Sequence, residues 1–266
     1  MQKSLLITGL ISTLIGGWSL QAKAQQTIVL YDQDFENPTG FVNQGGDINL
    51  TRTINDLYSN QPPGFVFAQT FTVETLLLTG NQAFGSGYSD PSGIGGNYAV
   101  GIQTRDQNDL LGLSFDTGGR DFLNFRLDIS SIDADRFGAP FVPNGAIPEF
   151  EFTLFDNPSG TPNIGSGSVL STFRASGTAS PRNVFDWTEV LAVLDASAST
   201  NGNVTLRIDL LNGGYAALDN FRIAASDTPG DVNDVPEPST IIALGALTIS
   251  GLATGFKRKF GKSKKK

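Results

Sequence analysis

The sequence runs Leu123-Asn124-Phe125-Arg126-Leu127-Asp128-Ile129-Ser130, and every second residue of this stretch is apolar. A β-strand turns successive side chains to opposite faces, so this alternation predicts a strand with one buried face and one polar face. Period-two patterns of the same kind predict further strands at Thr27–Phe35, Gly64–Val73, Glu149–Leu154 and Val204–Leu210.

Turn-forming residues separate these stretches, as in Asp116-Thr117-Gly118-Gly119 and Asn212-Gly213-Gly214. Many short strands between such turns, without a convincing amphipathic helix, favour an all-β fold, an antiparallel β-sandwich. The pattern is weakest at Thr188–Ser197, where a helical turn is an alternative. Residues Gly80–Gly96 are rich in Gly, Ser, Asn and Asp, so they should form the longest loop and could border a binding face.

The N-terminus has the features of a secretory signal peptide. Lys3 provides a positive charge, residues 5–20 are apolar or small, and Ala22-Lys23-Ala24 fits an A-x-A cleavage site. Cleavage after Ala24 would leave a mature chain that begins at Gln25, and an uncleaved anchor is the alternative. The chain contains no cysteine, so no disulfide can stabilise it.

Three different segments follow one another at the C-terminus. The hexapeptide Val235-Pro236-Glu237-Pro238-Ser239-Thr240 precedes an uncharged apolar run at Ile241–Phe256, and seven cations lie in residues 257–266. The apolar run is close to the length of a membrane-spanning helix, and its cationic end should stay cytoplasmic. These features divide the chain into a signal peptide (1–24), a β-sandwich (25–227), a linker (228–234) and a C-terminal signal (235–266).

This order of motif, apolar helix and basic end resembles the PEP-CTERM sorting signal of bacteria that make extracellular polysaccharide. The resemblance implies that a membrane-embedded transpeptidase, an exosortase, recognises Pro236-Glu237-Pro238 and removes the helix. The protein would then pass through the inner membrane and end at the cell surface or in the extracellular matrix. An ordinary C-terminal anchor helix is the alternative.

The expected mature domain is strongly acidic. Residues 25–234 contain nine arginines, no lysine and 25 acidic residues, which gives a formal net charge of −16. Such a surface repels nucleic acid and anionic lipid, so neither is an expected partner.

The absence of histidine and cysteine excludes several kinds of catalytic site, among them the Ser-His-Asp triad and ordinary zinc sites. A pair of carboxylates, as in glycoside hydrolysis, remains available. Glu149 and Glu151 point to the same face of their predicted strand, roughly 7 Å apart. Because they alternate with apolar residues, a solvated outer face explains them better.

Two segments at the ends of the sandwich, Tyr31–Pro38 and Tyr215–Ile223, resemble the jelly-roll carbohydrate-binding modules. The first and last strands of such modules meet, often with a structural calcium ion between them, so the resemblance implies Glu36 and Asp219 as calcium ligands. Asp219 should also share a strand face with Phe221, and an inward carboxylate needs a cation, an arginine or backbone N–H groups. An aspartate that hydrogen-bonds a turn at the strand end is the alternative.

Aromatic residues offer a further candidate site. Tyr88 and Tyr98 flank the Gly-rich loop and could stack on a sugar ring, whereas Trp187 is expected in the core. Together these features predict a non-catalytic exported protein that associates with the matrix or binds extracellular polysaccharide. A surface enzyme that uses carboxylates on glycosides, and a purely structural or adhesive protein, are the alternatives.

Overall fold

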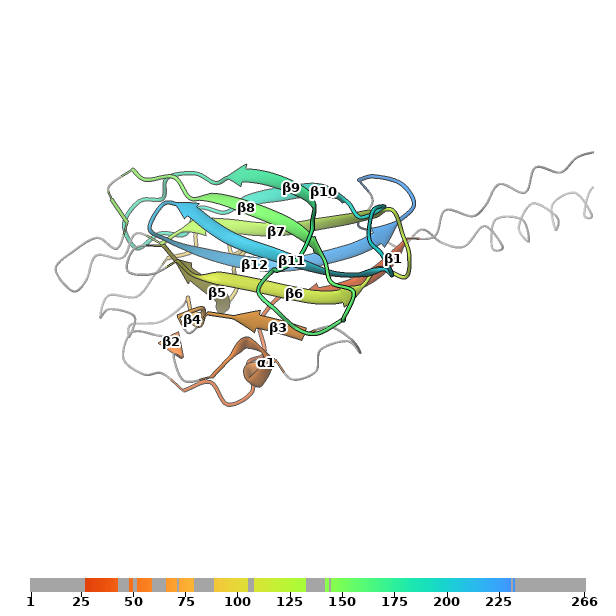
Figure 1. Ribbon diagram of the computed structural model, residues 1–266. Coiled ribbons are helices and arrows are strands. Elements are labelled where there is room, and N and C mark those ends of the chain that lie inside the picture. Colours follow the sequence, from red (N-terminus) through yellow and green to blue (C-terminus); the bar gives the residue numbers. More distant parts are fainter. Residues whose placement is uncertain are drawn as a thin grey trace, which may run out of the picture.

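The protein is described by a computed structural model of the 266-residue chain. The described residues are 27–42, 48–49, 52–58, 66–70, 72–78, 89–104, 108–132, 142–143, 145–230 and 232. They form two antiparallel sheets that lie face to face (Figure 1). One short helix, α1 (Ile54–Leu57), lies beside the five-stranded sheet and is capped by the side chain of Thr53.

The larger sheet has seven strands in the order β10-β7-β12-β5-β4-β2, and β1 also pairs with β12. These strands are β1 (Ile28–Gln33), β2 (Ile48–Asn49), β4 (Glu74–Leu77), β5 (Tyr98–Gln103), β7 (Phe122–Ser131), β10 (Thr188–Asp195) and β12 (Tyr215–Ser226). The smaller sheet has five strands in the order β3-β6-β11-β8-β9. They are β3 (Val66–Gln69), β6 (Leu110–Asp116), β8 (Glu149–Asp156), β9 (Val169–Ser176) and β11 (Asn203–Asn212).

The main core fills the space between the two sheets. Alternate residues of each long strand point into it, and the rings of Phe125 on β7 and Phe152 on β8 meet across it with centroids 4.8 Å apart. Leu206 and Ile208 of β11 are buried there as well. The alternation seen in the sequence therefore has the physical cause expected for a sandwich, one face of each sheet packed on the other.

A second apolar cluster lies on the other face of the larger sheet. Ala216 and Leu218 belong to the main core, whereas the alternate residues Tyr215 and Ala217 belong to this second cluster. The stacked rings of Phe185 and Trp187 cover it, with centroids 5.5 Å apart. Trp187 is thus partly buried on the outside of the sheet, not between the sheets.

The structure confirms the antiparallel sandwich and the five predicted strands. It also confirms that the first and last strands meet, because β1 pairs with β12. The segment Thr188–Ser197 is not a helical turn, since residues 188–195 form β10. The signal peptide and the C-terminal signal lie outside the described residues, and within the described ranges no helix is long and apolar enough to cross a bilayer.

Candidate functional site

Two strands, β5 and β1, pair with the same edge of β12. The candidate site lies where one pairing ends and the other begins. Tyr215–Leu218 pair with β5, whereas Phe221–Ala225 pair with β1. Asp219 and Asn220 lie between the two pairings. The segment after β1 and the start of β5 therefore meet beside these two residues.

A β-bulge interrupts β12 at this point. The register with β7 shifts between Asp219 and Arg222, and Asn220 adopts a left-handed backbone with φ of 51°. Asp219 pairs with Asp128, so it points to the outer face of the sheet, whereas Phe221 is buried in the core. The expectation that Asp219 shares the face of Phe221 is wrong, because the bulge breaks the period of two.

The segment after β1 is anchored on both sides of the bulge. Phe35, with φ of 53°, places its ring edge-on against Phe221 and Tyr58, each at a centroid distance of 5.2 Å. The Glu36 carboxylate accepts hydrogen bonds from the backbone N–H of Asn97 at 2.6 Å and of Tyr98 at 3.0 Å, and from the Asn97 side chain at 2.8 Å. Glu36 thus ties the end of β1 to the start of β5.

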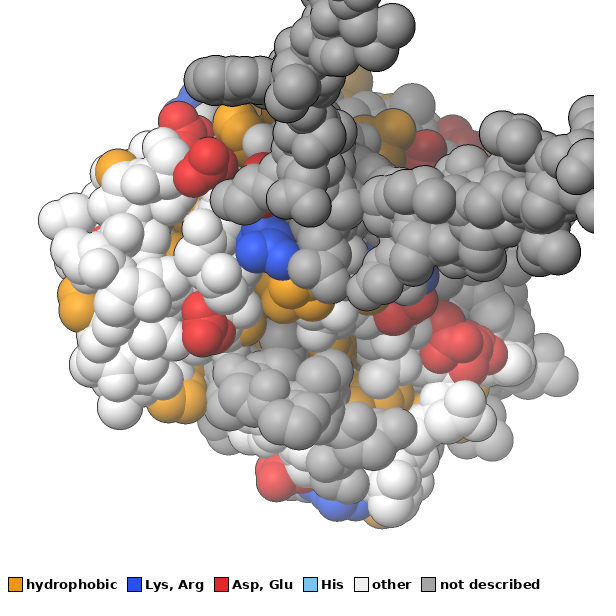
Figure 2. Space-filling view, turned by 90° about the vertical axis from the view of Figure 1, so that its right-hand side faces the viewer, with side chains coloured by type: hydrophobic (Ala, Val, Ile, Leu, Met, Phe, Trp, Pro, Cys, Tyr) orange, Lys and Arg blue, Asp and Glu red, His pale blue; other side chains and the backbone are white. Residues whose placement is uncertain are grey.

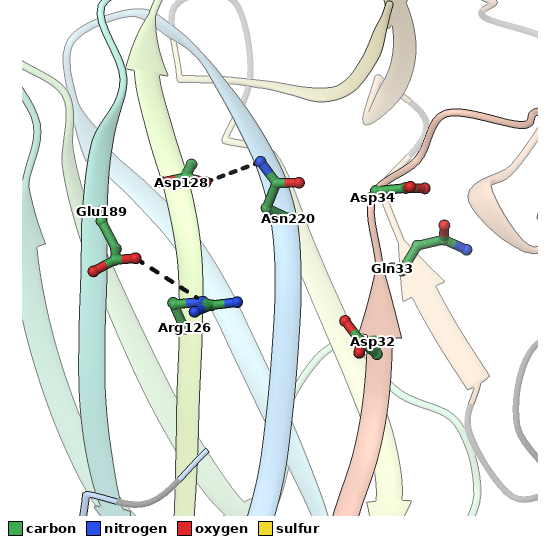
Figure 3. A pocket seen from close by; sticks show the side chains of 7 residues that line it. All are labelled: Asp32, Gln33, Asp34, Arg126, Asp128, Glu189 and Asn220. Atoms are coloured by element: carbon green, nitrogen blue, oxygen red, sulfur yellow. Dashed lines mark hydrogen bonds and ion pairs between the residues drawn. The ribbon is translucent and has the colours of Figure 1, made fainter. Parts of the chain in front are cut away.

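A cleft of about 320 Å³ opens on the outer face of the larger sheet, where β10, β7, β12 and β1 lie side by side (Figure 3). All of its lining side chains are polar: Asp32, Gln33, Asp34, Arg126, Asp128, Glu189 and Asn220. Strands fix most of these residues, so the lining is rigid.

An ion pair and a hydrogen bond connect the side chains on the floor of the cleft. The Arg126 guanidinium lies 4.0 Å from the Glu189 carboxylate, and the Asn220 amide donates to Asp128 at 2.9 Å (Figure 3). Burial raises the pKa of the Asp128 carboxyl, and the neighbouring Glu189 adds to the rise, while the Asn220 amide and Arg126 oppose it. One arginine among four acidic side chains leaves the cleft with an excess of negative charge.

Acidic side chains are scattered over the described surface at the end of the sandwich that faces the viewer in Figure 2, with few basic side chains between them. This part of the described surface is therefore acidic, as the composition predicts.

Asp219 lies next to the cleft, paired with Asp128 and adjacent to Asn220, with only 1% of its surface exposed. Its carboxylate accepts the backbone N–H of Asn220 at 2.7 Å. Burial raises the pKa of Asp219 to about 9 despite that hydrogen bond, and the charges of Glu36, Asp128 and Asp34 raise it further. Asp219 is neutral at pH 7 unless a cation compensates it.

The residues fit a calcium ion only in part. Several acidic groups close to a buried carboxyl suit a cation electrostatically. However, Glu36 already accepts three hydrogen bonds, and no three acidic side chains of the described residues converge closely enough to hold a metal. Backbone oxygens would have to complete the ligand set.

The other predicted site residues lie apart from the cleft. Tyr98 is half-buried at the start of β5, and its ring meets Phe41 edge-on at 5.2 Å. Glu151 is engaged by Arg174 at 2.7 Å on the smaller sheet, and Glu149 is exposed beside it, which fits a solvated outer face. The remaining candidates lie outside the described residues: Ala22, Ala24, Tyr88 and the motif Val235-Pro236-Glu237-Pro238-Ser239-Thr240.

Sequence reasoning missed the cleft itself. Arg126 and Asp128 were recognised as the polar face of a strand, but that pattern does not show which strands lie next to β7. Asn220 carried a further signal, because asparagine tolerates a left-handed backbone better than most residues. Of the predicted Gly-rich loop, Ile94 contacts the cleft residue Asn220, whose amide donates to the Ile94 carbonyl at 3.0 Å, whereas residues 80–88 lie outside the described residues.

Comparison with known proteins gives loose likenesses only. No family model and no curated protein matches the chain. Among solved structures, it is similar to the C-terminal family 22 carbohydrate-binding module of Clostridium thermocellum Xyn10B, at 13% identity over 78% of this chain and 97% of that one, with a TM-score of 0.38. A xylan-binding domain from Paenibacillus barcinonensis gives 14% identity, coverages of 77% and 99%, and a TM-score of 0.37.

An adhesin domain of Lys-gingipain from Porphyromonas gingivalis is equally similar, at 11% identity over 74% of this chain and 98% of that one, with a TM-score of 0.38. Scores this low do not transfer a ligand or a site. The function of this chain is therefore inferred from its own residues.

Proposed function

We propose that this chain is an exported, non-catalytic protein of the cell surface or extracellular matrix, and that its sandwich binds extracellular polysaccharide in the cleft on the larger sheet. The cleft is the observation that carries this proposal. Carboxylates accept hydrogen bonds from sugar hydroxyls, and Gln33, Asn220 and Arg126 can donate to them. Polar groups held in place by rigid strands can fix the orientation of a bound ligand.

Delivery through the C-terminal signal is part of the proposal. Its support is the sequence: the motif at Val235–Thr240, the apolar run at Ile241–Phe256 and the basic end follow one another as in PEP-CTERM proteins. An exosortase would be the processing partner, and the apolar helix would hold the precursor in the inner membrane. The signal peptide with Ala22 and Ala24 supports export of the domain.

Binding of purified exopolysaccharide, followed by calorimetry, tests the role of the cleft. Asp34→Asn and Asp128→Asn should each weaken binding about tenfold or more, because each removes a hydrogen-bonded carboxylate from the cleft. Glu149→Gln, exposed on the smaller sheet, is the matched control. A polysaccharide rich in uronic acids should bind worse than a neutral one, since the cleft is acidic. Equal binding by all variants would exclude this cleft as the site.

One observation favours a glycoside-active enzyme as the second candidate. Asp128 has a raised pKa and lies beside the carboxylate of Glu189, an environment in which one carboxyl can act as an acid and the other as a base. Release of reducing sugar that disappears in Glu189→Gln would establish this alternative. The absence of both binding and hydrolysis would leave a structural or adhesive role.

We also propose a structural calcium ion at Asp219 and Glu36. The support is the buried position of Asp219 among acidic neighbours. Calcium should stabilise the domain more than magnesium at equal ionic strength, because a site with many oxygen ligands prefers the larger ion. Asp219→Asn should abolish that preference, and Glu149→Gln should retain it. If both ions act alike on the unchanged chain, Asp219 is a protonated, hydrogen-bonded carboxyl.

A further inference from the structure

The chain does not leave the domain at the end of β12. Residues 227–230 and Val232, here called the C-terminal strap, fold back over the outer face of the larger sheet. The backbone N–H of Gly230 donates to the side-chain oxygen of Asn124 at 2.7 Å, and the Asn124 amide reaches the Thr228 carbonyl at 3.5 Å. Asn124 is fully buried and Val232 is 7% exposed. The first part of the predicted linker is therefore packed on the sheet.

Arg222 connects the strap to the cleft. Its Nε donates to the Val232 carbonyl at 2.8 Å, and its Nη1 contacts the carboxylate of Asp32, which lines the cleft. Arg222 also pairs in register with Arg126, and like charges directly opposite each other on a sheet repel. Each arginine is drawn to its own acidic partner, Arg222 to Asp32 and Arg126 to Glu189.

Asp32 is not the only carboxylate within reach of Arg222. Asp34 lies two residues after Asp32, just beyond the end of β1, and Asp128 lies two residues from Arg126 on β7; Asp32 and Arg126 are the residues that pair with Arg222. Such diagonal neighbours are roughly 7–8 Å apart, a distance that a long side chain can span. Both carboxylates line the cleft, whereas Arg222 does not. The bond to the Val232 carbonyl favours Asp32, because the guanidinium can make it only while it points toward the strap.

We infer that the C-terminal strap keeps the cleft open by holding Arg222 on Asp32. When the strap is released, the guanidinium turns to Asp34 or Asp128 and occupies the cleft. This inference rests on the proposed role of the cleft as a binding site and adds its regulation. Mechanical tension on the chain, or cleavage that lifts residues 227–230 and Val232 off the sheet, would lower the affinity for ligand without changing any lining residue.

The absence of cysteine makes a direct test possible, because Gln33→Cys places a unique thiol on the cleft wall. The full chain in detergent is treated with iodoacetamide, and the rate of alkylation reports how open the cleft is. Gly230→Pro releases the strap, since proline has no N–H for Asn124 and cannot adopt the φ of 91° found there. Gly230→Ala keeps the N–H and its new Cβ meets no atom within 4 Å, but a φ of 91° strains any residue with a Cβ, so alanine should release the strap less completely than proline.

Gly230→Pro should slow alkylation roughly tenfold if Arg222 fills the cleft in nine of ten molecules. Gly230→Ala should react at a rate between those of the parent and Gly230→Pro, and adding Arg222→Met to Gly230→Pro should restore the rate. A thiol from Val169→Cys, exposed on β9, is the control and should react alike in every background. Hydrogen exchange of residues 227–232 confirms that the strap is docked in the parent and released in the variant.

Two results would overturn the inference. One is an unchanged alkylation rate in Gly230→Pro although the strap has become exchangeable, and the other is a slow rate that Arg222→Met does not relieve. Rapid exchange of the strap in the parent would also overturn it. Polysaccharide takes no part in this assay, so a failure of the proposed function is detected separately.

Discussion

Replacing Glu74 by glutamine should stabilise the domain above pH 7 and change little at pH 4. Glu74 lies on β4 with 6% of its surface exposed, and the Tyr215 hydroxyl donates to its carboxylate. Gly101 lies opposite it on β5, and a Cβ at Gly101 would come within 2.8 Å of that hydroxyl. The hydrogen-bonded side chains of Glu74 and Tyr215 therefore pack directly against Gly101, which has no side chain.

Burial raises the pKa of Glu74 from 4.5 to about 7, the Tyr215 hydroxyl opposes the rise, and the charge of Asp109 adds to it. The folded state binds the Glu74 proton more tightly than the unfolded state does. The free energy of unfolding is therefore highest below pH 4.5, where Glu74 is protonated in both states. This free energy falls between pH 4.5 and 7 and then levels off. A difference of about 2.5 pKa units corresponds to roughly 3 kcal/mol at pH 8.

Glutamine keeps the acceptor for Tyr215 and carries no charge at any pH. Urea denaturation of both proteins between pH 4 and 8 should show the variant gaining about 3 kcal/mol relative to the parent, or roughly 6–12 °C in Tm for a domain of this size. Glu149→Gln, an exposed carboxyl on β8, controls for the change in net charge. Parallel stability curves for Glu74→Gln and the parent would refute the argument that an uncompensated buried carboxylate limits stability.

Three further outcomes are expected. Gly112→Ala should destabilise the domain by roughly 2–4 kcal/mol in urea denaturation, because the new Cβ would lie 2.2 Å from the Asn163 carbonyl oxygen and backbone cannot move aside easily; a loss under 1 kcal/mol would contradict this. N-terminal sequencing of the exported protein should begin at Gln25, and a start at Met1 would mean an uncleaved anchor. Glu237→Ala should leave full-length precursor in the membrane fraction on immunoblots, whereas equal export would remove the motif from the sorting proposal.

Residue periodicity predicted the sandwich because most strands bury one face completely. It was ambiguous at β10, where Leu191 and Val193 are exposed and Val190, Ala192 and Leu194 are buried. Apolar residues on both faces hide the period of two in the sequence. The strand becomes evident only from its antiparallel pairing with β7.

The candidate site was less predictable, for two physical reasons. Its lining comes from four strands, and their order in the sheet depends on packing between residues far apart in the chain. The bulge at Asn220 also reverses the side on which Asp219 lies, and a single residue with a left-handed backbone leaves no periodic trace. The resemblance to carbohydrate-binding modules pointed to Glu36 and Asp219, and these two lie close enough for the charge of Glu36 to raise the pKa of Asp219; that they bind calcium stays a prediction.

The pairing of β1 with β12 has a consequence for the order in which the chain can fold. Asp32 and Arg222, which pair across these strands, are 190 residues apart. Bringing these two strands together closes a long loop, and the entropy that this costs is recovered only when the contacts between β1 and β12 form. β12 must therefore be present before β1 can pair with it. A ribosome-bound chain cannot complete this sheet until synthesis has passed Ser226. The topology thus keeps the nascent polypeptide incompletely folded until its last strand has been synthesised, which under the proposed export would leave the chain able to pass through a narrow translocation pore.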